Sequence, residues 1–509
     1  MFAPMGQPQT HSPTYQPRHP GDTILYKVLA DHIETFIAQR QGDGKELPKF
    51  VAKELREFLR CGLLQYGFLR TKCQNCDFER AVPFSCKGRG FCPSCCGKRM
   101  AEKAYHLIDN ILPDAPYRQW VLSLPIPLRF WMATNKKLTS KVHQITSQEI
   151  AAYYITAAKS QGIDNPLPGS ITFIQRFGSA CNLNTHFHLV ALEGVYVTPQ
   201  SSDAIPRFTT FTPPSDQDVC DVVEKIAAKT IKYLRKKGYL QEEGEEVLRP
   251  DFDPLFQDHP GLTEAMAASI QGKIAFGERA GQKVRRVGSG FGYEQETPVV
   301  KGTQCATVNG FNLHAKVGVA LHARDRLLQL IKYVTRPPIS NQRLHLKENG
   351  DLLYELKTPW SDGTTAILLS PEELCEKVAA LIPPPNSHLT RYSGVFSSHS
   401  KWRSKIVLRP EKRAGFGTGR CPDDATDRKK VKNHKWAKLL ARTFNVDVGT
   451  CPNCAGDMII IAAVQDPREV QRYLRHIGMK EHPPPIAPAR HIQGELAFDD
   501  CATLNTFDE

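Results

Sequence analysis

The sequence predicts an α+β fold with an antiparallel sheet, a helical and zinc-ribbon module at the N-terminus, and a small C-terminal region. Segments with strand spacing alternate with segments of helical spacing through the middle of the chain. Two C-x-x-C pairs lie close together near the N-terminus, as in zinc ribbons. A chain of 509 residues also has room for about three domains by the usual length range.

The N-terminal part contains a tail and a cysteine-rich module. Residues 1–22 are rich in Pro, Gln, Ser and His, and we expect a disordered tail. Helical spacing from Ile24 to Leu59, broken at Pro48, predicts two helices. Together with the cysteines that follow, these helices are expected to form a zinc-binding, DNA-binding module over 23–110.

The middle of the chain, 115–345, is expected to form the α+β domain, with 241–307 as an insertion. The segment from Trp120 predicts a strand whose prolines mark either an edge of the sheet or the point where the chain leaves it, and Asn349-Gly350 predicts a hairpin in the next region. A basic C-terminal region is expected over 346–465 and a tail over 466–509. The remaining predicted strands are 171–177, 185–197 and a strand beginning at His314, and the predicted helices are 141–159, 219–240 and 324–334.

Charge and hydropathy restrict the functional classes. The chain has 66 Lys and Arg against 53 Asp and Glu, a net charge of +13, which suits binding to nucleic acid but equally suits a basic soluble enzyme. No apolar run is long enough to span a bilayer and no signal sequence opens the chain, so we expect a cytosolic protein. In that compartment 15 cysteines favour metal binding over disulfides.

Thr185-His186-Phe187-His188 is the most informative motif. In a strand, side chains alternate between faces, so His186 and His188 point to one face and Phe187 to the other. Two neutral imidazoles on one rigid face form half of a site for a divalent cation. A pair of ordinary sheet histidines is the alternative.

Cys73, Cys76, Cys92 and Cys95 have the spacing of a structural four-thiolate zinc site, and we predict that they bind one Zn²⁺. Cys86 could replace one of these ligands, and Cys61 and Cys96 are spare thiols. Nearby basic residues suit a module resting on phosphates, or a solvated face. They are Lys72, Lys87, Arg89, Lys98 and Arg99.

Cys451 and Cys454 form half of another such site. Cys421, His434 or His476 could complete it, and a tight turn with two free thiols is the alternative.

The segment 324–334 predicts a helix with two distinct faces. Leu327, Leu330 and Ile331 lie on the apolar face, whereas Gln329 and Tyr333 lie on a polar face that also carries Arg326. Lys332 and Arg336 flank the tyrosine, and cations favour the nucleophilic phenolate. An exposed structural tyrosine is the alternative. With the two histidines, this face suggests metal-assisted attack of a tyrosine on a phosphodiester.

Four motifs in this order resemble the rolling-circle transposases of the insertion sequence ninety-one family and its common-region relatives, within the HUH superfamily of single-strand endonucleases. They are the zinc module ending at Cys95, the His-hydrophobe-His strand, Tyr333-Val-Thr-Arg-Pro-Pro-Ile339, and Arg391-Tyr-Ser-Gly-Val-Phe396 with the closing Cys451-Pro-Asn-Cys454. The resemblance covers residues 25–465 and implies a ferredoxin-like sheet in the nuclease domain.

The resemblance also implies a mechanism. Tyr333 would join the 5′-phosphate of cleaved single-stranded DNA, and His186 and His188 would hold Mg²⁺ or Mn²⁺. Gln329 is the expected third ligand, with His322 and Asp325 as alternatives. Lys332 and Arg336 would contact DNA phosphates. Tyr392 or Trp402 could stack on bases, although both could equally be core residues.

Some relatives carry a second tyrosine four residues after the first, where this chain has Pro337, so we expect a single-tyrosine variant. The implied partners are single-stranded DNA at element ends and targets, a second copy of the chain, and host replication machinery in the bacterial nucleoid. Three other functions fit the motifs: a replication initiator or relaxase, a non-enzymatic zinc-ribbon regulator, and a metallohydrolase that uses water.

Overall fold

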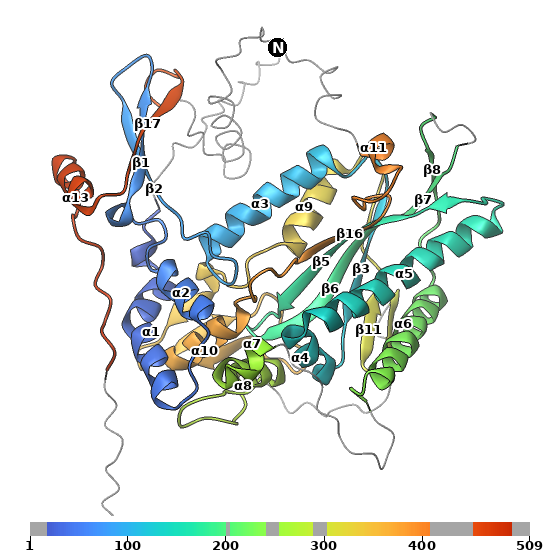
Figure 1. The fold of residues 1–509 in the computed structure, drawn as a ribbon, viewed down its shortest axis with the longest axis horizontal. Coiled ribbons are helices and arrows are strands. Elements are labelled where there is room, and N and C mark those ends of the chain that lie inside the picture. Colours follow the sequence, from blue (N-terminus) through green and yellow to red (C-terminus); the bar gives the residue numbers. More distant parts are fainter. Residues whose placement is uncertain (1–17, 200–203, 241–253, 289–302, 408–450, 491–509) are drawn as a thin grey trace, which may run out of the picture.

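The main antiparallel sheet forms the centre of the fold, in the order β10-β11-β3-β6-β5-β16, with β12 paired to the edge of β3. The computed structural model describes residues 18–199, 204–240, 254–288, 303–407 and 451–490 (Figure 1). In sheet order the strands are β10 (Cys305–Val308), β11 (Phe311–His314), β3 (Tyr117–Ser123), β6 (Leu183–Leu192), β5 (Gly169–Phe177) and β16 (Thr390–Gly394), with β12 (Gly318–Val319).

β6 is hydrogen-bonded along both edges, to β3 on one side and to β5 on the other. His186 pairs with Ser123 and with Gln175, which fixes its register in the sheet. Because neighbouring side chains alternate, Phe187 and Leu189 point to the face opposite the histidines. Both apolar side chains are fully buried.

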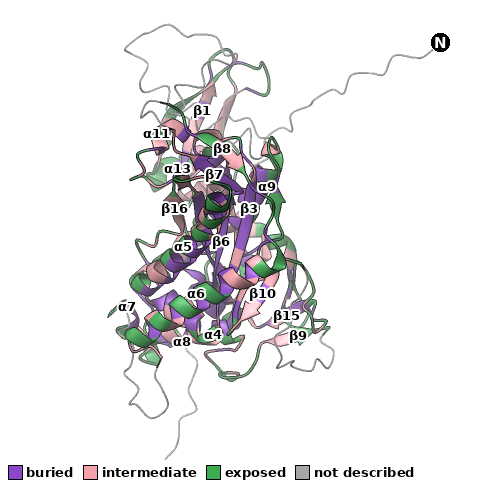
Figure 2. Ribbon diagram, turned by 90° about the vertical axis from the view of Figure 1, so that its right-hand side faces the viewer, coloured by how far each residue is buried: buried purple, intermediate pink, exposed green. Residues whose placement is uncertain are grey.

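Helices cover both faces of this sheet (Figure 2). The face of Phe187 packs against α4 (Ile126–Thr134), α5 (Lys136–Ser160) and α6 (Asp216–Lys236). The histidine face packs, beyond the histidines, against α3 (Pro93–Asn110) and α9 (Arg324–Val334). The predicted α+β class with an antiparallel sheet is confirmed, and β5 and β6 form the expected hairpin.

A second core joins the N-terminal helices to segments from the later half of the chain. Residues expected in the 241–307 insertion and in the 346–465 region pack there, and β16 of the latter region enters the main sheet. The elements of this core are α1 (Ile24–Gly42), α2 (Lys49–Phe58), α7 (Pro254–Gln257), α8 (Pro260–Gln271), α10 (Pro371–Leu381), β13 (Leu344–Leu346), β14 (Leu352–Glu355) and β15 (Ala366–Leu369), to which β9 (Arg285–Val287) pairs.

The N-terminal hairpin pairs with a strand from the C-terminal part of the chain. β1 (Phe68–Cys73) and β2 (Glu79–Pro83) form the hairpin, and β17 (Met458–Val464) adds to β1 (Figure 1). Helix α13 (Pro467–His476) follows β17. The remaining short elements are β4 (Pro166–Leu167), β7 (Gly194–Val197), β8 (Arg207–Thr210), α11 (Arg403–Ile406) and the 3-10 turns η1 (Pro20–Asp22), η2 (Leu64–Tyr66) and η3 (Asn341–Arg343).

Two of the expected strands end earlier in the structure than the sequence suggested. The strand expected to run on from Trp120 ends at Ser123, because Pro125 caps the start of α4. The strand expected from 185 to 197 is two strands, β6 and β7, which a bend at Glu193 separates. The expected N-terminal tail lies mostly in 1–17, outside the described residues. Of the helices described, none is long and apolar enough to cross a membrane.

Phe187→Ala should destabilise the protein strongly, because it leaves a cavity between the sheet and α5. We expect the free energy of unfolding to fall by roughly 3–5 kcal/mol. Urea denaturation followed by tryptophan fluorescence measures this change, since Trp120 lies in the same cluster. Ile205→Ala is the control, because Ile205 is 76% exposed. Equal midpoints for the two variants would contradict this description of the core.

Candidate functional site

His186 and His188 converge on one point at the middle of the sheet. Their Nε2 atoms lie 3.0 Å apart. Two ligand atoms about 2.1 Å from one ion, at a right angle to each other, are also about 3.0 Å apart. The pair therefore has the spacing of two adjacent ligands of a divalent cation.

The surroundings keep both imidazoles neutral with Nε2 available. Burial lowers the pKa of His186 to about 4 and holds that of His188 well below its usual value, where the neighbouring His186 and Arg336 add to the effect. His186 Nδ1 donates to the carbonyl oxygen of Asn184 at 2.8 Å, which leaves the lone pair on Nε2. Both rings are thus unprotonated ligands at neutral pH.

Gln119 on β3 fixes the second ring. Its side-chain amide lies 2.8 Å from Nδ1 of His188. The amide nitrogen faces the ring, and a half-turn would present the oxygen instead. Nδ1–H would then donate to Gln119, and Nε2 of His188 would carry the free lone pair.

Tyr333 lies over the histidines at the end of α9. Its ring meets that of His188 edge-to-face, with 6.3 Å between centroids, and its side chain is 42% exposed. Gln175 Nε2 donates to the carbonyl of Val334 at 3.2 Å, which ties the end of α9 to β5. The structure thus brings together two motifs about 145 residues apart in the sequence.

Two cations stack on the tyrosine ring. The Arg336 guanidinium lies 4.7 Å from the ring centroid, and Lys357 Nζ lies at the same distance. Lys332, expected to contact phosphate, lies instead over the ring of Tyr105 on α3, at 5.0 Å. Lys357 therefore occupies the position beside the tyrosine that the sequence suggested for Lys332.

A cleft of about 840 Å³ contains the two histidines and Tyr333. Gln329, the expected third ligand, lines this cleft, whereas the alternatives His322 and Asp325 do not. His322 points to solvent and pairs with Asp114. Within the described residues, no third His, Cys, Asp or Glu joins the histidine pair in a metal-binding group. The remaining lining residues are polar or cationic at many positions, among them Ser123, Asn184, His314, Lys316 and Arg326.

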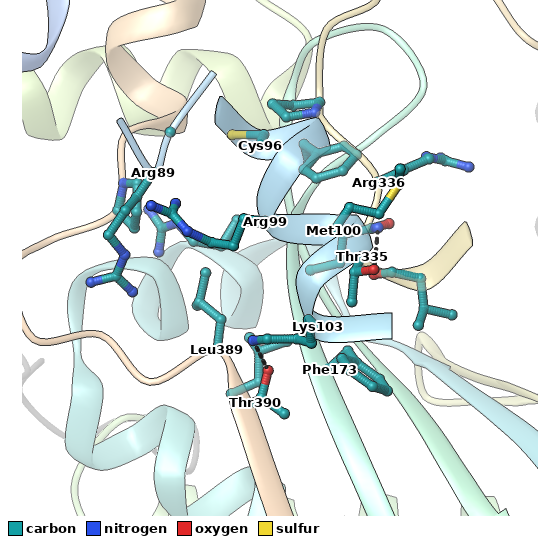
Figure 3. Close-up of a pocket in the computed structure, with 18 of the residues that line it drawn as sticks. Arg89, Cys96, Arg99, Met100, Lys103, Phe173, Thr335, Arg336, Leu389 and Thr390 are labelled. Atoms are coloured by element: carbon teal, nitrogen blue, oxygen red, sulfur yellow. Dashed lines mark hydrogen bonds between the residues drawn. The ribbon is translucent and has the colours of Figure 1, made fainter. Parts of the chain in front are cut away.

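A basic cavity of about 130 Å³ adjoins this cleft, and Gln175, Phe177 and Arg336 line both. Figure 3 shows Arg89, Arg99 and Lys103 gathered in it, with Lys103 donating to Thr390 Oγ1 at 2.6 Å. Burial lowers the pKa of Lys103, and the two arginines lower it further. No aspartate or glutamate is among the described residues that line the cavity.

Arg176, at the same cavity, is a buried cation that forms no ion pair with any described residue. It is 8% exposed, and its Nε and Nη2 have no hydrogen-bond partner in the described part of the chain, while Nη1 donates to the carbonyl oxygen of Ala133 at 3.3 Å. Burial lowers its pKa to about 10, so it stays charged at pH 7. Buried unpaired charge is costly unless an anion compensates it. The cavity is therefore suited to an anionic group.

Cys61, Cys86, Cys92 and Cys95 form one cluster at the start of α3. Neighbouring sulfurs lie 3.4–3.7 Å apart. Four thiolates about 2.3 Å from a zinc ion would lie about 3.8 Å apart, so the cluster fits a tetrahedral Zn²⁺. Three of the cysteines are buried in the N-terminal core, which suits a structural ion.

Cys73, Cys76, Cys451 and Cys454 form a second cluster. The predicted site of Cys73, Cys76, Cys92 and Cys95 is therefore wrong, because its two halves belong to different clusters. β1 carries Cys73 to the tip of the hairpin, and strands rise about 3.3 Å per residue. The length of the hairpin therefore separates Cys73 and Cys76 from Cys92 and Cys95 by on the order of 15–20 Å. Cys61 and Cys86, which the sequence left as spare thiols, complete the site of Cys92 and Cys95.

The partners of Cys451 and Cys454 are thus Cys73 and Cys76. His476, one of the expected candidates, ends α13 and is not part of the cluster. Cys421 and His434 lie outside the described residues.

Sequence reasoning missed several residues of the site. Gln119 and Gln175 lie on the strands that flank β6, on the same face as the histidines, and period-two spacing with known pairing would have found them. Nothing local marks Lys357 or Arg176. Of the two aromatic residues considered for base stacking, Trp402 is a core residue, which was the alternative given for it. Tyr392 is 36% exposed on β16.

Comparisons with known proteins match both halves of this arrangement. A family model described as "Putative transposase" matches residues 169–403, which contain the histidines and Tyr333. A model described as "Transposase zinc-binding domain" matches residues 28–124, which contain the first cysteine cluster. No solved structure matches the chain.

One curated relative is also similar over part of its length. The chain is 27% identical over 140 residues to the transposase for insertion sequence element IS801 from Pseudomonas savastanoi pv. phaseolicola. The match covers 27% of this chain and 32% of that transposase, so the chain spans about a third of its relative's length.

Cys92→Ser should remove zinc from the first cluster and destabilise the N-terminal module by several kcal/mol, because three thiolates hold the ion less well and the cluster lies in the core. Calorimetric melting with and without added zinc measures the loss. Cys220→Ser is the control, since Cys220 belongs to neither cluster. A variant that melts like the wild type and keeps its zinc would contradict the assignment.

Proposed function

Because the chain belongs to the IS91-type transposase family, we propose that it cleaves and rejoins single-stranded DNA at the ends of an insertion element through a covalent phosphotyrosine. The observation that carries this proposal is the position of Tyr333 beside two converging histidines, in an open cleft lined by cations.

The histidine pair suits the binding of Mg²⁺ or Mn²⁺. His186 and His188 would supply two ligands and Gln329 an amide oxygen, with water in the remaining positions. When bound, the ion neutralises charge on the scissile phosphate and orients it for attack. Gln119 would hold the ring of His188 in the tautomer that leaves Nε2 free.

In the proposed reaction the phenolic oxygen of Tyr333 attacks the phosphorus atom. The bond from this oxygen to phosphorus forms as the bond from phosphorus to the 3′ oxygen breaks, and the freed 3′ oxygen takes up a proton as the phenol loses one. Arg336 and Lys357 stabilise the negative charge that develops beside the ring. Attack by a 3′-hydroxyl on the phosphotyrosine then rejoins the strand and restores Tyr333.

The position of the basic cavity is consistent with a DNA strand that extends past Tyr333. Arg336 lines both spaces, so a strand whose scissile phosphate lies at Tyr333 can place a neighbouring phosphate beside Arg176 and Lys103. Single-stranded substrate is the form we propose, because the reacting phosphate must reach a buried pair of histidines. A dimer and nucleoid association, with host replication machinery as partner, belong to the same proposal.

Tyr333→Phe should lower the yield of covalent protein–DNA adduct by a factor of at least ~10³, because it removes the attacking oxygen and little else. The assay incubates the protein and Mn²⁺ with single-stranded oligonucleotides that tile the DNA flanking the gene, followed by denaturing electrophoresis. Tyr153→Phe, on the far face of the sheet, should retain the adduct.

Other outcomes favour the alternatives. Cleavage that persists in Tyr333→Phe without an adduct would indicate a water nucleophile. DNA binding without any cleavage would indicate a regulator. Adducts formed at a replication or transfer origin, but not at element ends, would indicate an initiator or relaxase.

Arg176→Gln should weaken binding of single-stranded DNA about tenfold and reduce the salt dependence by about one phosphate contact, without loss of thermal stability. Fluorescence anisotropy over a range of salt concentrations measures both quantities. Arg472→Gln is the control, because Arg472 is a largely exposed residue of α13, far along the chain from this cavity. Equal affinities for the two variants would exclude the cavity from the DNA path.

A further inference from the structure

The second cysteine cluster draws its members from opposite ends of the chain: Cys73 and Cys454 are 381 residues apart, and their sulfurs lie 3.4 Å from each other. We propose that Cys73, Cys76, Cys451 and Cys454 hold a second structural zinc ion, which fastens the C-terminal segment 451–490 to the N-terminal hairpin. The matched zinc-binding model ends at residue 124 and so includes only half of these ligands.

The sulfur geometry fits a tetrahedral ion. Cys76 Sγ lies 3.6 Å from both Cys451 Sγ and Cys454 Sγ. Disulfide sulfurs lie about 2.05 Å apart, so these contacts are not disulfides. They agree instead with the separation of about 3.8 Å expected between thiolates on one zinc ion.

The backbone around the sulfurs has the form of two opposed knuckles. The amide of Asn75 donates to Cys73 Sγ at 3.3 Å, as in turns that direct two sulfurs to one ion. In the other knuckle, Ala455 has a positive φ of 59° and its amide donates to the carbonyl of Cys451 at 2.9 Å. Each C-x-x-C turn thus presents its thiols on the side that faces the other.

The two knuckles also contact each other directly. The amide of Gln74 donates to the carbonyl of Asp457 at 3.0 Å. A Cβ atom on Gly456 would lie 2.6 Å from Asn75 Nδ2, so only glycine permits this approach without a shift of Asn75. The backbone therefore holds the two halves at the distance that a shared ion requires.

The apolar core beside the second cysteine cluster is too small to stabilise β1, β2, β17 and α13 alone. Among the described residues, this apolar core has three fully buried side chains, Phe68, Val470 and Leu474. β17 leaves Ile459, Ile460 and Ile461 about 40% exposed. Small modules with so little core depend on disulfides or metals for stability.

The proposed ion would anchor a segment that extends well beyond the cysteines. Beyond α13, the carbonyl of Lys480 accepts a hydrogen bond of 2.8 Å from the side chain of Gln65. The amide of Ala487 donates to the carbonyl of Ala30 on α1 at 2.9 Å. Four thiolates select zinc over magnesium or manganese and leave no open position. This ion would be structural, unlike the ion proposed for the histidines.

Counting zinc in full-length variants tests the proposal. Elemental analysis of the wild type should give two zinc ions per chain. Cys73→Ser/Cys76→Ser and Cys451→Ser/Cys454→Ser should each give one. The quadruple variant should also give one, because both pairs serve the same ion. Cys220→Ser should retain two, and Cys454→His should as well, since imidazole is also a zinc ligand.

Several results would overturn the proposal. One zinc ion in the wild type, or two in Cys451→Ser/Cys454→Ser, would show that the C-terminal pair binds none. Loss of both ions in the quadruple variant, with one lost in each double variant, would show that the pairs serve separate sites. The zinc retained by the first cluster, with the circular dichroism spectrum, shows that the variants remain folded. A Co²⁺-loaded wild type should show two ions with sulfur charge-transfer bands, and one such ion would equally contradict the proposal.

Discussion

The double-sided pairing of β6 is the constraint on which the site depends. A strand bonded to neighbours on both edges cannot slip without breaking two ladders, and a slip of one residue would exchange its two faces. Burial of Phe187 and Leu189 on the helix-covered side therefore fixes the histidines on the other side. The same face of the sheet receives Leu327, Leu330 and Ile331 of α9, which brings the polar face of that helix over the histidines.

The first cysteine cluster and the candidate site around Tyr333 share one structural element, α3. Cys92 caps this helix, Cys95 lies in its first turn, and Arg99 and Lys103 follow one and two turns later and line the basic cavity. Further along, Ala104 and Leu107 pack on the same sheet face as α9. An ion at the first cluster would thus orient the cations of the cavity relative to Tyr333, and would link a structural metal to the proposed placement of DNA.

Local periodicity carried most of what the sequence could reveal. Alternation at His186 and His188 and the two faces of 324–334 depend only on backbone geometry, and the structure bears out both placements. The grouping of the cysteines could not be read in this way, because C-x-x-C spacing defines a pair and not its partner. The positions of Lys357 and Arg176 at the site could not be predicted either, since each reaches the site through packing between distant segments.

The pairing of β17 with β1 has a consequence for how the chain is made. During synthesis the N-terminal hairpin leaves the ribosome about 380 residues before its partner strand, which at ~5–20 residues per second is roughly 20–75 s. Throughout that time the outer edge of β1 is unpaired, and such edges template aggregation. Arg70 and Lys72 place charge along this strand, in the manner of residues that discourage intermolecular pairing of an exposed edge. Nascent chains stalled before residue 451 should therefore be the form of this protein most dependent on chaperones.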